Sequence, residues 1–470
     1  MPILHPEMPQ YEFDLIVIGS GPAGQRGAIA AAKLGKRVAI IDRRELVGGV
    51  CLHTGTIPSK TLREAILYLS GLRQRAFYGR DYSLKEEITM ADLTSRVHQV
   101  MARELEVIRS QLKRNNVTML CGAASFSDPH HVAIVDDSGS HTVVGASNVL
   151  IACGTRPARC KDIPFDGERF IDSDEILNLR SLPREMIVVG GGVVGLEYAS
   201  MFAALGVRVS VIDARDRLLE FADHEMVDLL CHHMRGQNAV FRLGDAVDEV
   251  GYDARARISV RLRSQRVVRG DVLLYSVGRQ TNADLLGLEA AGLAADPRGR
   301  IGVNQWYQTD VPHIYAAGDV IGFPALAATS SEQGRAAASH MFGAPVPDPE
   351  DVLLPYGLYT IPEISMVGAT EDALTRDRVP YDIGLARFAE LARAQMMGLD
   401  TGMLKVLFHR ETRRILGVHA FGDSATELVH IGQTAMALGG TIEYFRDAVF
   451  NYPTLAEAYK VAGLDGTNRL

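Results

Sequence analysis

The chain has 470 residues, and its 47% hydrophobic and 23% charged residues are typical of a globular protein with about two to four domains. A net charge of −8 without blocks of like charge gives no sign of a nucleic-acid or membrane partner, and no apolar stretch approaches the roughly 18 residues of a transmembrane helix. The N-terminus lacks the layout of a signal peptide and the five cysteines have no C-x-x-C spacing, so we expect a cytoplasmic protein without a disulfide framework or metal site.

A glycine-rich fingerprint follows the first apolar strand. The segment reads Phe13-Asp-Leu-Ile-Val-Ile-Gly19-Ser-Gly21-Pro-Ala-Gly24, and an Ala-rich helix then leads to a second strand that ends at Asp42. Such glycines permit a tight turn, the close approach of a pyrophosphate and close packing of the helix on the strand. The helix N-terminus offers unpaired N–H groups to phosphates, and the terminal acid can accept hydrogen bonds from a ribose hydroxyl. The sequence therefore predicts a dinucleotide site.

Helices and strands continue this first unit. Periodic Leu, Val and Ile predict helices over about 59–71 and 89–115, and strand-like segments lie near 131–135 and 141–144. An apolar strand then ends in Cys153-Gly154-Thr155-Arg-Pro157, where Gly and Pro indicate a domain boundary.

The same fingerprint recurs in matching register at Met186-Ile-Val-Val-Gly190-Gly-Gly192-Val-Val-Gly195, and its unit ends at Asp213. A second boundary signal around Gly278 echoes the first. One such glycine motif is weak evidence, but two copies in the same strand–helix–strand context form an internal repeat. The sequence therefore predicts two bound dinucleotides.

The C-terminal part has a different character. A strand ends at Gly318-Asp319, a helix is predicted over about 329–342, and closely spaced prolines from Pro345 to Pro355 mark a linker. The last 115 or so residues combine alternating strands with Ala/Leu-rich helices near 424–438 and 454–463, without a dinucleotide fingerprint. This third domain needs another purpose.

Three segments carry a resemblance to a known family. They are Gly48-Gly-Val-Cys51-Leu-His-Thr-Gly-Thr56-Ile-Pro-Ser-Lys60, Gly318-Asp319 and Tyr359-Thr-Ile-Pro-Glu363-Ile-Ser-Met-Val-Gly368. Together with the fingerprints, they resemble the flavoprotein disulfide reductases over essentially the whole chain. The resemblance implies an α/β fold like that of glutathione reductase, with two Rossmann-like domains and a C-terminal α+β domain that makes a homodimer. The implied domains are an FAD-binding domain at 1–155 completed by 283–350, an NAD(P)-binding domain at 156–282 and a dimerisation domain at 351–470.

The resemblance also implies the cofactor-binding residues. For FAD they are Gly19, Gly21, Gly24, Asp42, Gly48, Gly49, Cys51, Lys60, Ala124, Gly154, Asp319 and Ala327. For the nicotinamide dinucleotide they are Gly190, Gly192, Gly195, Asp213, Arg215, Arg217 and Gly278.

Two departures from the family pattern argue against disulfide reduction. Disulfide reductases relay electrons through Cys-x-x-x-x-Cys, but here Cys51 is followed by Thr56, whose hydroxyl cannot form a disulfide. The family's C-terminal His base is replaced by Tyr452, whose phenol, with an ordinary pKa near 10, cannot do the work of an imidazole. The dithiol apparatus is missing while the dinucleotide apparatus remains.

This altered pattern looks like the FAD-containing soluble pyridine nucleotide transhydrogenases, which implies hydride transfer between NADPH and NAD⁺ through FAD. The implied catalytic residues are Lys60 and Glu197, as an ion pair beside the flavin, and Tyr452 and Glu457, contributed by the partner subunit. The alternative for the first pair is a solvated lysine and an unrelated glutamate. Cys51 is expected to pack against the flavin rather than to react, and assembly beyond the dimer stays open.

Nucleotide preference stays open at this stage. Asp213 favours the free 2′-hydroxyl of NAD(H), whereas Arg215 and Arg217 offer charge to the 2′-phosphate of NADP(H). This combination suits an enzyme that accepts both nucleotides, and it also fits an NAD enzyme with two surface arginines.

Two other functions remain as alternatives. One is an NAD(P)H:quinone or dye reductase of the same fold, and the other is a non-catalytic redox-sensing flavoprotein. Retention of Lys60 and Glu197 counts against the redox-sensing flavoprotein, because a non-catalytic protein does not need charged residues beside the flavin.

Overall fold

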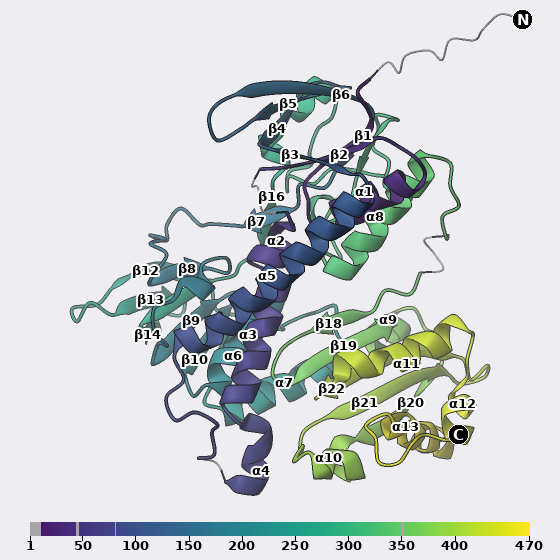
Figure 1. The fold of residues 1–470 in the computed structure, drawn as a ribbon. Coiled ribbons are helices and arrows are strands. Elements are labelled where there is room, and N and C mark those ends of the chain that lie inside the picture. Colours follow the sequence, from purple (N-terminus) through teal and green to yellow (C-terminus); the bar gives the residue numbers. More distant parts are fainter. Residues whose placement is uncertain (1–10, 44–46, 80, 349–351) are drawn as a thin grey trace, which may run out of the picture. The chain divides into compact units, whose positions relative to one another are not determined.

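The computed structural model describes residues 11–43, 47–79, 81–348 and 352–470, and these residues form two compact units (Figure 1). Unit 1 comprises 1–58, 97–158 and 279–352, and unit 2 comprises 59–96, 159–278 and 353–470. Two of the five boundaries, at 58/59 and 96/97, fall within the helices α3 (Thr56–Leu69) and α5 (Met90–Arg114). The division into three domains stays a prediction.

Unit 1 is built on a parallel sheet in the order β3-β2-β1-β6, with β17 beside β6. An antiparallel extension runs through β6, β5 and β4, and β7 pairs with β16. The strands are β1 (Phe13–Ile18), β2 (Val38–Asp42), β3 (Thr118–Cys121), β4 (Ala123–Asp128), β5 (His131–Val135), β6 (His141–Ile151), β7 (Thr155–Pro157), β16 (Arg279–Thr281) and β17 (Ile314–Ala316). The helices include α1 (Pro22–Lys33), α2 (Gly49–His53), α8 (Ala327–Met341) and the 3-10 turns η3 (Ala283–Leu285), η4 (Leu288–Ala291) and η5 (Asp319–Ile321).

The central strand β1 explains the core of unit 1. It is apolar almost throughout because parallel strands are covered on both faces. Ile16 and Ile18 belong to one hydrophobic cluster, and Leu15 and Val17 belong to the other. Because side chains alternate along a strand, β1 contributes to a hydrophobic core on each face of the sheet. The strand ends at Ile18, directly before the glycine loop.

Unit 2 contains a parallel sheet in the order β11-β10-β9-β15-β8 and two antiparallel sheets, β12-β13-β14 and β18-β19-β22-β21-β20. Its strands are β8 (Phe170–Asp172), β9 (Glu185–Val189), β10 (Arg208–Asp213), β11 (Val240–Leu243), β12 (Val247–Tyr252), β13 (Ile258–Leu262), β14 (Val267–Gly270), β15 (Val272–Tyr275), β18 (Tyr356–Leu358), β19 (Glu363–Gly368), β20 (Tyr381–Arg387), β21 (Met403–His409) and β22 (Ile415–Gly422). Its helices include α4 (Arg75–Tyr78), α6 (Val193–Ala204), α7 (His224–Gly236), α9 (Glu371–Arg376), α10 (Ala392–Met396), α11 (Ala425–Ala437), α12 (Ile442–Asp447), α13 (Glu457–Asn468) and the 3-10 turns η1 (Leu72–Gln74), η2 (Ile176–Asn178) and η7 (Phe388–Glu390).

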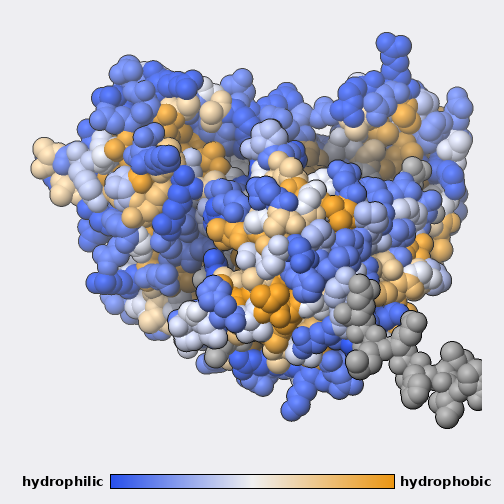
Figure 2. All heavy atoms as spheres, turned by 90° about the horizontal axis from the view of Figure 1, so that it is seen from above, coloured by the Kyte–Doolittle hydropathy of each residue, from blue (hydrophilic) through white to orange (hydrophobic). Residues whose placement is uncertain are grey.

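The predicted α/β class is confirmed, and the repeat is visible in both units: a buried strand, a glycine loop, a helix and a parallel strand ending in Asp42 or Asp213. On the face shown in Figure 2, hydrophilic residues predominate and apolar residues form separate groups among them.

Candidate functional site

The first glycine loop connects β1 to α1. A Cβ on Gly19 would lie 2.2 Å from the carbonyl oxygen of Ala152, and one on Gly24 would lie 1.9 Å from that of Gly19. A Cβ on Gly21 would meet nothing within 4 Å. Two glycines are therefore required by packing, while Gly21 leaves space in front of the helix N-terminus. This is the cradle that a dinucleotide pyrophosphate needs, so the loop fits FAD.

Ser20 ties the loop to two other predicted FAD residues. Its backbone N–H donates to Asp42 Oδ2 at 2.9 Å, its hydroxyl also donates to that carboxylate, and the N–H of Gly48 donates to its Oγ at 2.9 Å. A Cβ on Gly49 would lie 2.9 Å from the Cα of Gly21. The structure thus brings Asp42, Gly48 and Gly49 to the first loop.

Asp319 lies at the start of η5, where its carboxylate accepts a hydrogen bond from the hydroxyl of Thr155 at 3.0 Å. Gly154, next to Thr155, has φ +65°, and a Cβ there would meet nothing within 4 Å. Ala327 begins α8, and Ala124 lies in β4 opposite Ile134.

The second glycine loop, in unit 2, repeats the geometry of the first. A Cβ on Gly190 would lie 2.6 Å from the carbonyl oxygen of Ser276, and one on Gly195 would lie 1.9 Å from that of Gly190. Gly192 has open space, as does Gly278, whose φ is +93°. The same division between packed and open glycines means that this loop also fits a pyrophosphate.

At the end of β10, Arg215 folds back onto Asp213. Its Nη2 lies 2.7 Å from Oδ2 of Asp213 and its Nε 2.9 Å from Oδ1. The N–H groups of Arg215 and Gly191 donate to the same carboxylate at 2.9 and 2.7 Å. Burial by itself would raise the pKa of Asp213, but the hydrogen bonds from Arg215 and Gly191 outweigh it and hold this pKa below its usual range. Asp213 is therefore an ionised carboxylate whose two oxygens are both engaged.

Arg217 does not join this contact. It is exposed, and its Nη1 lies 3.0 Å from Nδ1 of His224, which in turn lies 3.0 Å from Oδ2 of Asp372. The two arginines, two positions apart in the sequence, thus have different partners.

Lys60 and Glu197 form the expected ion pair. The Nζ of Lys60 lies 2.7 and 2.9 Å from the two carboxylate oxygens of Glu197. Glu197 is 4% exposed, and its Oε1 also accepts a hydrogen bond from the N–H of Tyr359 at 2.9 Å. The same Nζ lies 5.0 Å from the centre of the Tyr359 ring, at the range of a cation–π contact. The alternative of a solvated lysine and an unrelated glutamate is excluded by this geometry, while the catalytic role stays a prediction.

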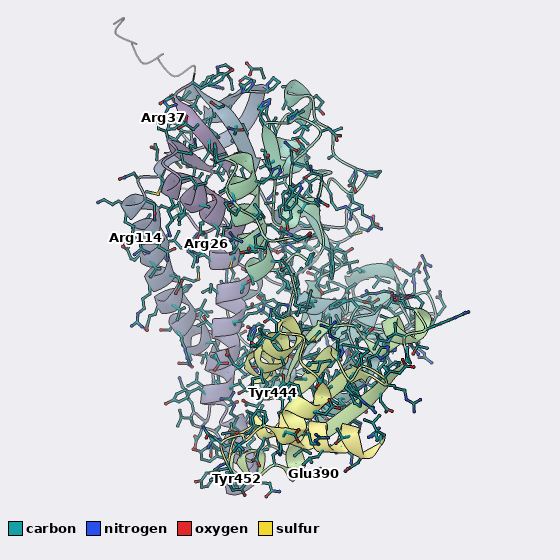
Figure 3. All side chains as sticks on the ribbon, turned by 90° about the vertical axis from the view of Figure 1, so that its right-hand side faces the viewer. Arg26, Arg37, Arg114, Glu390, Tyr444 and Tyr452 are labelled. Atoms are coloured by element: carbon teal, nitrogen blue, oxygen red, sulfur yellow. The ribbon has the colours of Figure 1, made fainter. Side chains whose placement is uncertain are left out.

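The remaining predicted residues lie near helix starts or on the surface. Cys51 is half-buried in α2, and Thr56 begins α3. Tyr452 is 74% exposed on the segment before α13 (Figure 3). Glu457 begins α13, and its buried Oε2 has no hydrogen-bond partner within the described part of the chain.

The sequence did not single out the roles of Ser20 and Thr155, or of Tyr359 through its backbone N–H. Short polar residues beside glycines and at strand ends were the available signal for the first two. The contact of Tyr359 joins positions 162 apart in the chain, and no local pattern reveals it.

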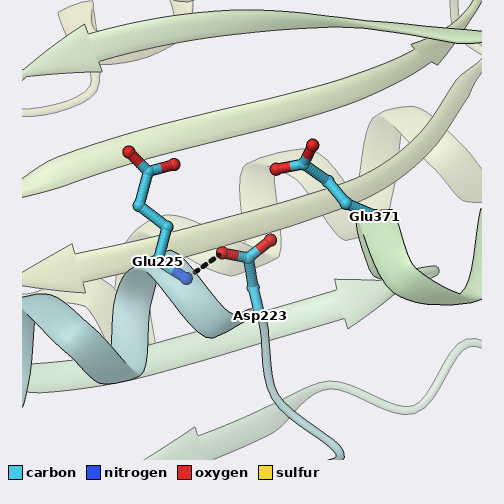
Figure 4. A group of neighbouring side chains, drawn as sticks. All are labelled: Asp223, Glu225 and Glu371. Atoms are coloured by element: carbon cyan, nitrogen blue, oxygen red, sulfur yellow. Dashed lines mark hydrogen bonds between the residues drawn. The ribbon is translucent and has the colours of Figure 1, made fainter.

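Unit 2 also holds a group of three acids that resembles a cation site: Asp223, Glu225 and Glu371 (Figure 4). The ammonium group of Lys405 takes that place, since its Nζ lies 3.0, 2.7 and 2.5 Å from their respective carboxylates. Burial by itself would lower the pKa of Lys405, but hydrogen bonds to Glu225 and Glu371 and the charge of Asp223 raise it. The acids are therefore compensated by a buried lysine.

Comparisons with known proteins agree with this geometry. The family described as pyridine nucleotide-disulphide oxidoreductase matches residues 13–334, and its dimerisation domain matches residues 354–462. The soluble pyridine nucleotide transhydrogenase of Mycobacterium tuberculosis is 53% identical over 460 residues, with 98% of each chain covered. That of Colwellia psychrerythraea is 45% identical over 463 residues, covering 98% of this chain and 99% of the relative.

Solved structures show the same fold. LpdA from M. tuberculosis superimposes with a TM-score of 0.87 at 27% identity, covering 96% of this chain and 99% of its own. The HOCl-induced flavoprotein disulfide reductase RclA from Escherichia coli does so with a TM-score of 0.85 at 26% identity and the same coverage. Within the described residues, no helix has the length and apolar character to span a bilayer. The chain belongs to the pyridine nucleotide-disulphide oxidoreductase family, and it resembles over almost its full length the members named soluble pyridine nucleotide transhydrogenase.

Proposed function

We propose that this protein is an FAD-dependent pyridine nucleotide transhydrogenase, which transfers hydride reversibly between NADPH and NAD⁺. The observation that carries the proposal is the combination, in one chain, of an intact Lys60–Glu197 pair with a Cys51 loop whose second thiol position is Thr56. The charged pair is retained, whereas no disulfide can form within that loop, so the loop cannot relay two electrons to a disulfide substrate. The full-length similarity to named transhydrogenases supports the same conclusion.

The first loop would hold FAD. Gly21 leaves room for the pyrophosphate, Asp42 offers a carboxylate to the ribose, and Asp319 offers one to the remaining polar part of the cofactor. Bound FAD would supply the redox centre that accepts the hydride from one nicotinamide and returns it to another. The protein's own residues would bind and orient FAD and the nicotinamide, and they would provide charge beside the flavin.

Lys60 would provide the charge. Its ammonium is held by a buried carboxylate and by the Tyr359 ring, so its position is fixed before the reaction begins. A fixed cation stabilises negative charge that develops during hydride transfer. Glu197 holds the ammonium group of this lysine in place.

The second loop would take both nicotinamide dinucleotides in turn. Asp213 can accept hydrogen bonds from the 2′-hydroxyl of NAD(H), provided that Arg215 moves aside. Arg215 can instead pair with the 2′-phosphate of NADP(H) in a charge-assisted contact. NAD(H) would thus bind Asp213 and NADP(H) would bind Arg215, the two members of the same ion pair.

The C-terminal domain at 351–470 would make a homodimer. In this arrangement the exposed Tyr452 and Glu457, whose Oε2 has no hydrogen-bond partner among the described residues, would complete the partner's flavin site. The scattered cysteines suit the reducing cytoplasm, which is where we place the protein.

The test is anaerobic. The purified yellow protein is reduced with NADPH, thio-NAD⁺ is added, and flavin reoxidation and thio-NADH are followed together. Fast reoxidation with stoichiometric thio-NADH is expected. Flavin that stays reduced until a quinone is added would replace the proposal by a quinone reductase, and flavin that NADPH never reduces would leave a redox-sensing role.

A further inference from the structure

A cavity of about 380 Å³ lies between α1 and α5 in unit 1. Its volume falls in the range of sites that bind small molecules. It is lined by Arg26, Ile29, Lys33, Gln111, Arg114 and Asn115.

Three of the six lining side chains are cationic, and none is acidic. Figure 3 shows Arg26 on α1 and Arg114 on the adjacent α5. Arg37, elsewhere in unit 1, has an acidic partner, since its Nη2 lies 2.9 Å from Oδ1 of Asp14. Within the described residues, Arg26, Lys33 and Arg114 take part in no ion pair or hydrogen bond of their side chains. The cavity therefore gathers positive charge that the protein itself does not neutralise.

Helix ends explain only part of this charge. Lys33 and Arg114 each end a helix, where a cation offsets the partial negative charge of the last carbonyl groups. Arg26 is the fifth residue of α1, beyond its first turn, so neither end of the helix accounts for its charge in this cavity.

We propose that this cavity binds a phosphate-bearing anion. Arginine presents a planar fork that matches phosphate oxygens in pairs, and lysine adds a compact positive charge. The amide of Gln111 can donate to further oxygens, and the buried Ile29 gives the cavity an apolar wall. The ligand is either a free polyphosphate or the phosphate end of a nucleotide, and the site is independent of the proposed hydride transfer.

Calorimetric titration of the FAD-loaded protein tests this proposal. The nicotinamide site is first saturated with NADP⁺, and inorganic pyrophosphate and ADP are then titrated in separate experiments. We expect one site per chain, weakened by salt. The double variant Lys33→Gln/Arg114→Gln should lower the affinity by about tenfold or more, since hydrogen bonds to charged groups are lost.

The matched control is Lys113→Gln. Lys113 is exposed beside Arg114 but does not line the cavity, so its replacement should leave the affinity unchanged. Pyrophosphate binding as tight as that of ADP would assign the site to phosphate alone, and tighter binding of ADP would assign it to a nucleotide. Absence of binding to the unmodified protein, or equal affinity in the double variant, would overturn the proposal.

Discussion

Asp213 and Arg215 are the residues on which the proposed preference for NAD(H) or NADP(H) depends. The bidentate contact between them occupies both groups that a nucleotide ribose would use. In the proposed site, a 2′-phosphate would compete for Arg215 and a 2′-hydroxyl would compete for Asp213. If the site accepts both nucleotides, as we propose, the ion pair that either of them would have to open gives that property a physical basis.

Replacing Arg215 by Ala should separate the two nucleotides. The variant loses the partner of the 2′-phosphate and frees Asp213, so KM for NADPH should rise by about tenfold while KM for NADH stays the same or falls. Steady-state kinetics with each nucleotide measures this. Arg208→Ala, at the exposed opposite end of β10, is the control and should change neither KM. Equal increases for both nucleotides in Arg215→Ala would favour the plain NAD enzyme.

Lys60 is the residue whose positive charge we expect to accelerate hydride transfer. Lys60→Gln removes the cation and leaves the buried Glu197 without its partner, so we expect hydride transfer to slow by roughly 10²-fold. Stopped-flow flavin reduction at saturating NADPH measures the rate. Lys60→Arg keeps the positive charge, so this variant should keep most of the rate of flavin reduction. A Lys60→Gln protein that is folded, holds FAD and reacts at the normal rate would show that the pair is only structural.

At the scale of elements, the glycine loops depend on packing as much as on ligands. In the second loop, Gly195 lets α6 approach β9 closely, whereas Gly192 faces open space. We therefore expect the two glycines of one motif to serve different purposes, Gly195 for the packing of the fold and Gly192 for the nucleotide.

A pair of alanine variants should separate these purposes. Gly195→Ala places a methyl group 1.9 Å from the carbonyl oxygen of Gly190, so the loop must shift and stability should fall by about 1–3 kcal/mol. Gly192→Ala should unfold at nearly the same denaturant concentration as the unmodified protein but bind NADPH more weakly. Denaturant unfolding and nucleotide titration measure the two effects. Similar losses of stability in both variants would contradict this division.

At the scale of the whole molecule, the C-terminal domain leaves large apolar side chains exposed near its end. Tyr444, Val449 and Tyr452 are all exposed, and Val449 is 97% exposed. Residues so placed contribute little to the folding of a single chain. They lie within or close to the segment that matches the family's dimerisation domain, where a partner subunit would cover them.

Val449→Asp should weaken the dimer without unfolding the chain. A charge forced into an apolar interface is costly, so the variant should sediment as a monomer at concentrations where the unmodified protein is dimeric. Its FAD content and circular dichroism should stay normal. Val143→Asp, an exposed valine in β6 outside the dimerisation domain, should leave the dimer intact. A dimer of unchanged stability in Val449→Asp would exclude this segment from the interface.

Local signals in the sequence were sufficient for much of the fold. The two fingerprints predicted both glycine loops and their flanking strands, and periodicity placed α3 and α5 within a few residues. These features depend on spacing along a short stretch of chain. Contacts between distant stretches could not be inferred in this way, as Lys405 shows with acids from α9 and the start of α7.

The sequence by itself determined the α/β class, the repeat, the two dinucleotide loops and the loss of the second thiol, because each depends on residue type and local spacing. Only the tertiary structure decided that Arg215 engages Asp213, that Tyr359 holds the Lys60–Glu197 pair and that Arg26, Lys33 and Arg114 share one cavity. The strength of an ion pair or a hydrogen bond depends on the distance between its two groups, and only the fold sets that distance for residues far apart in the chain.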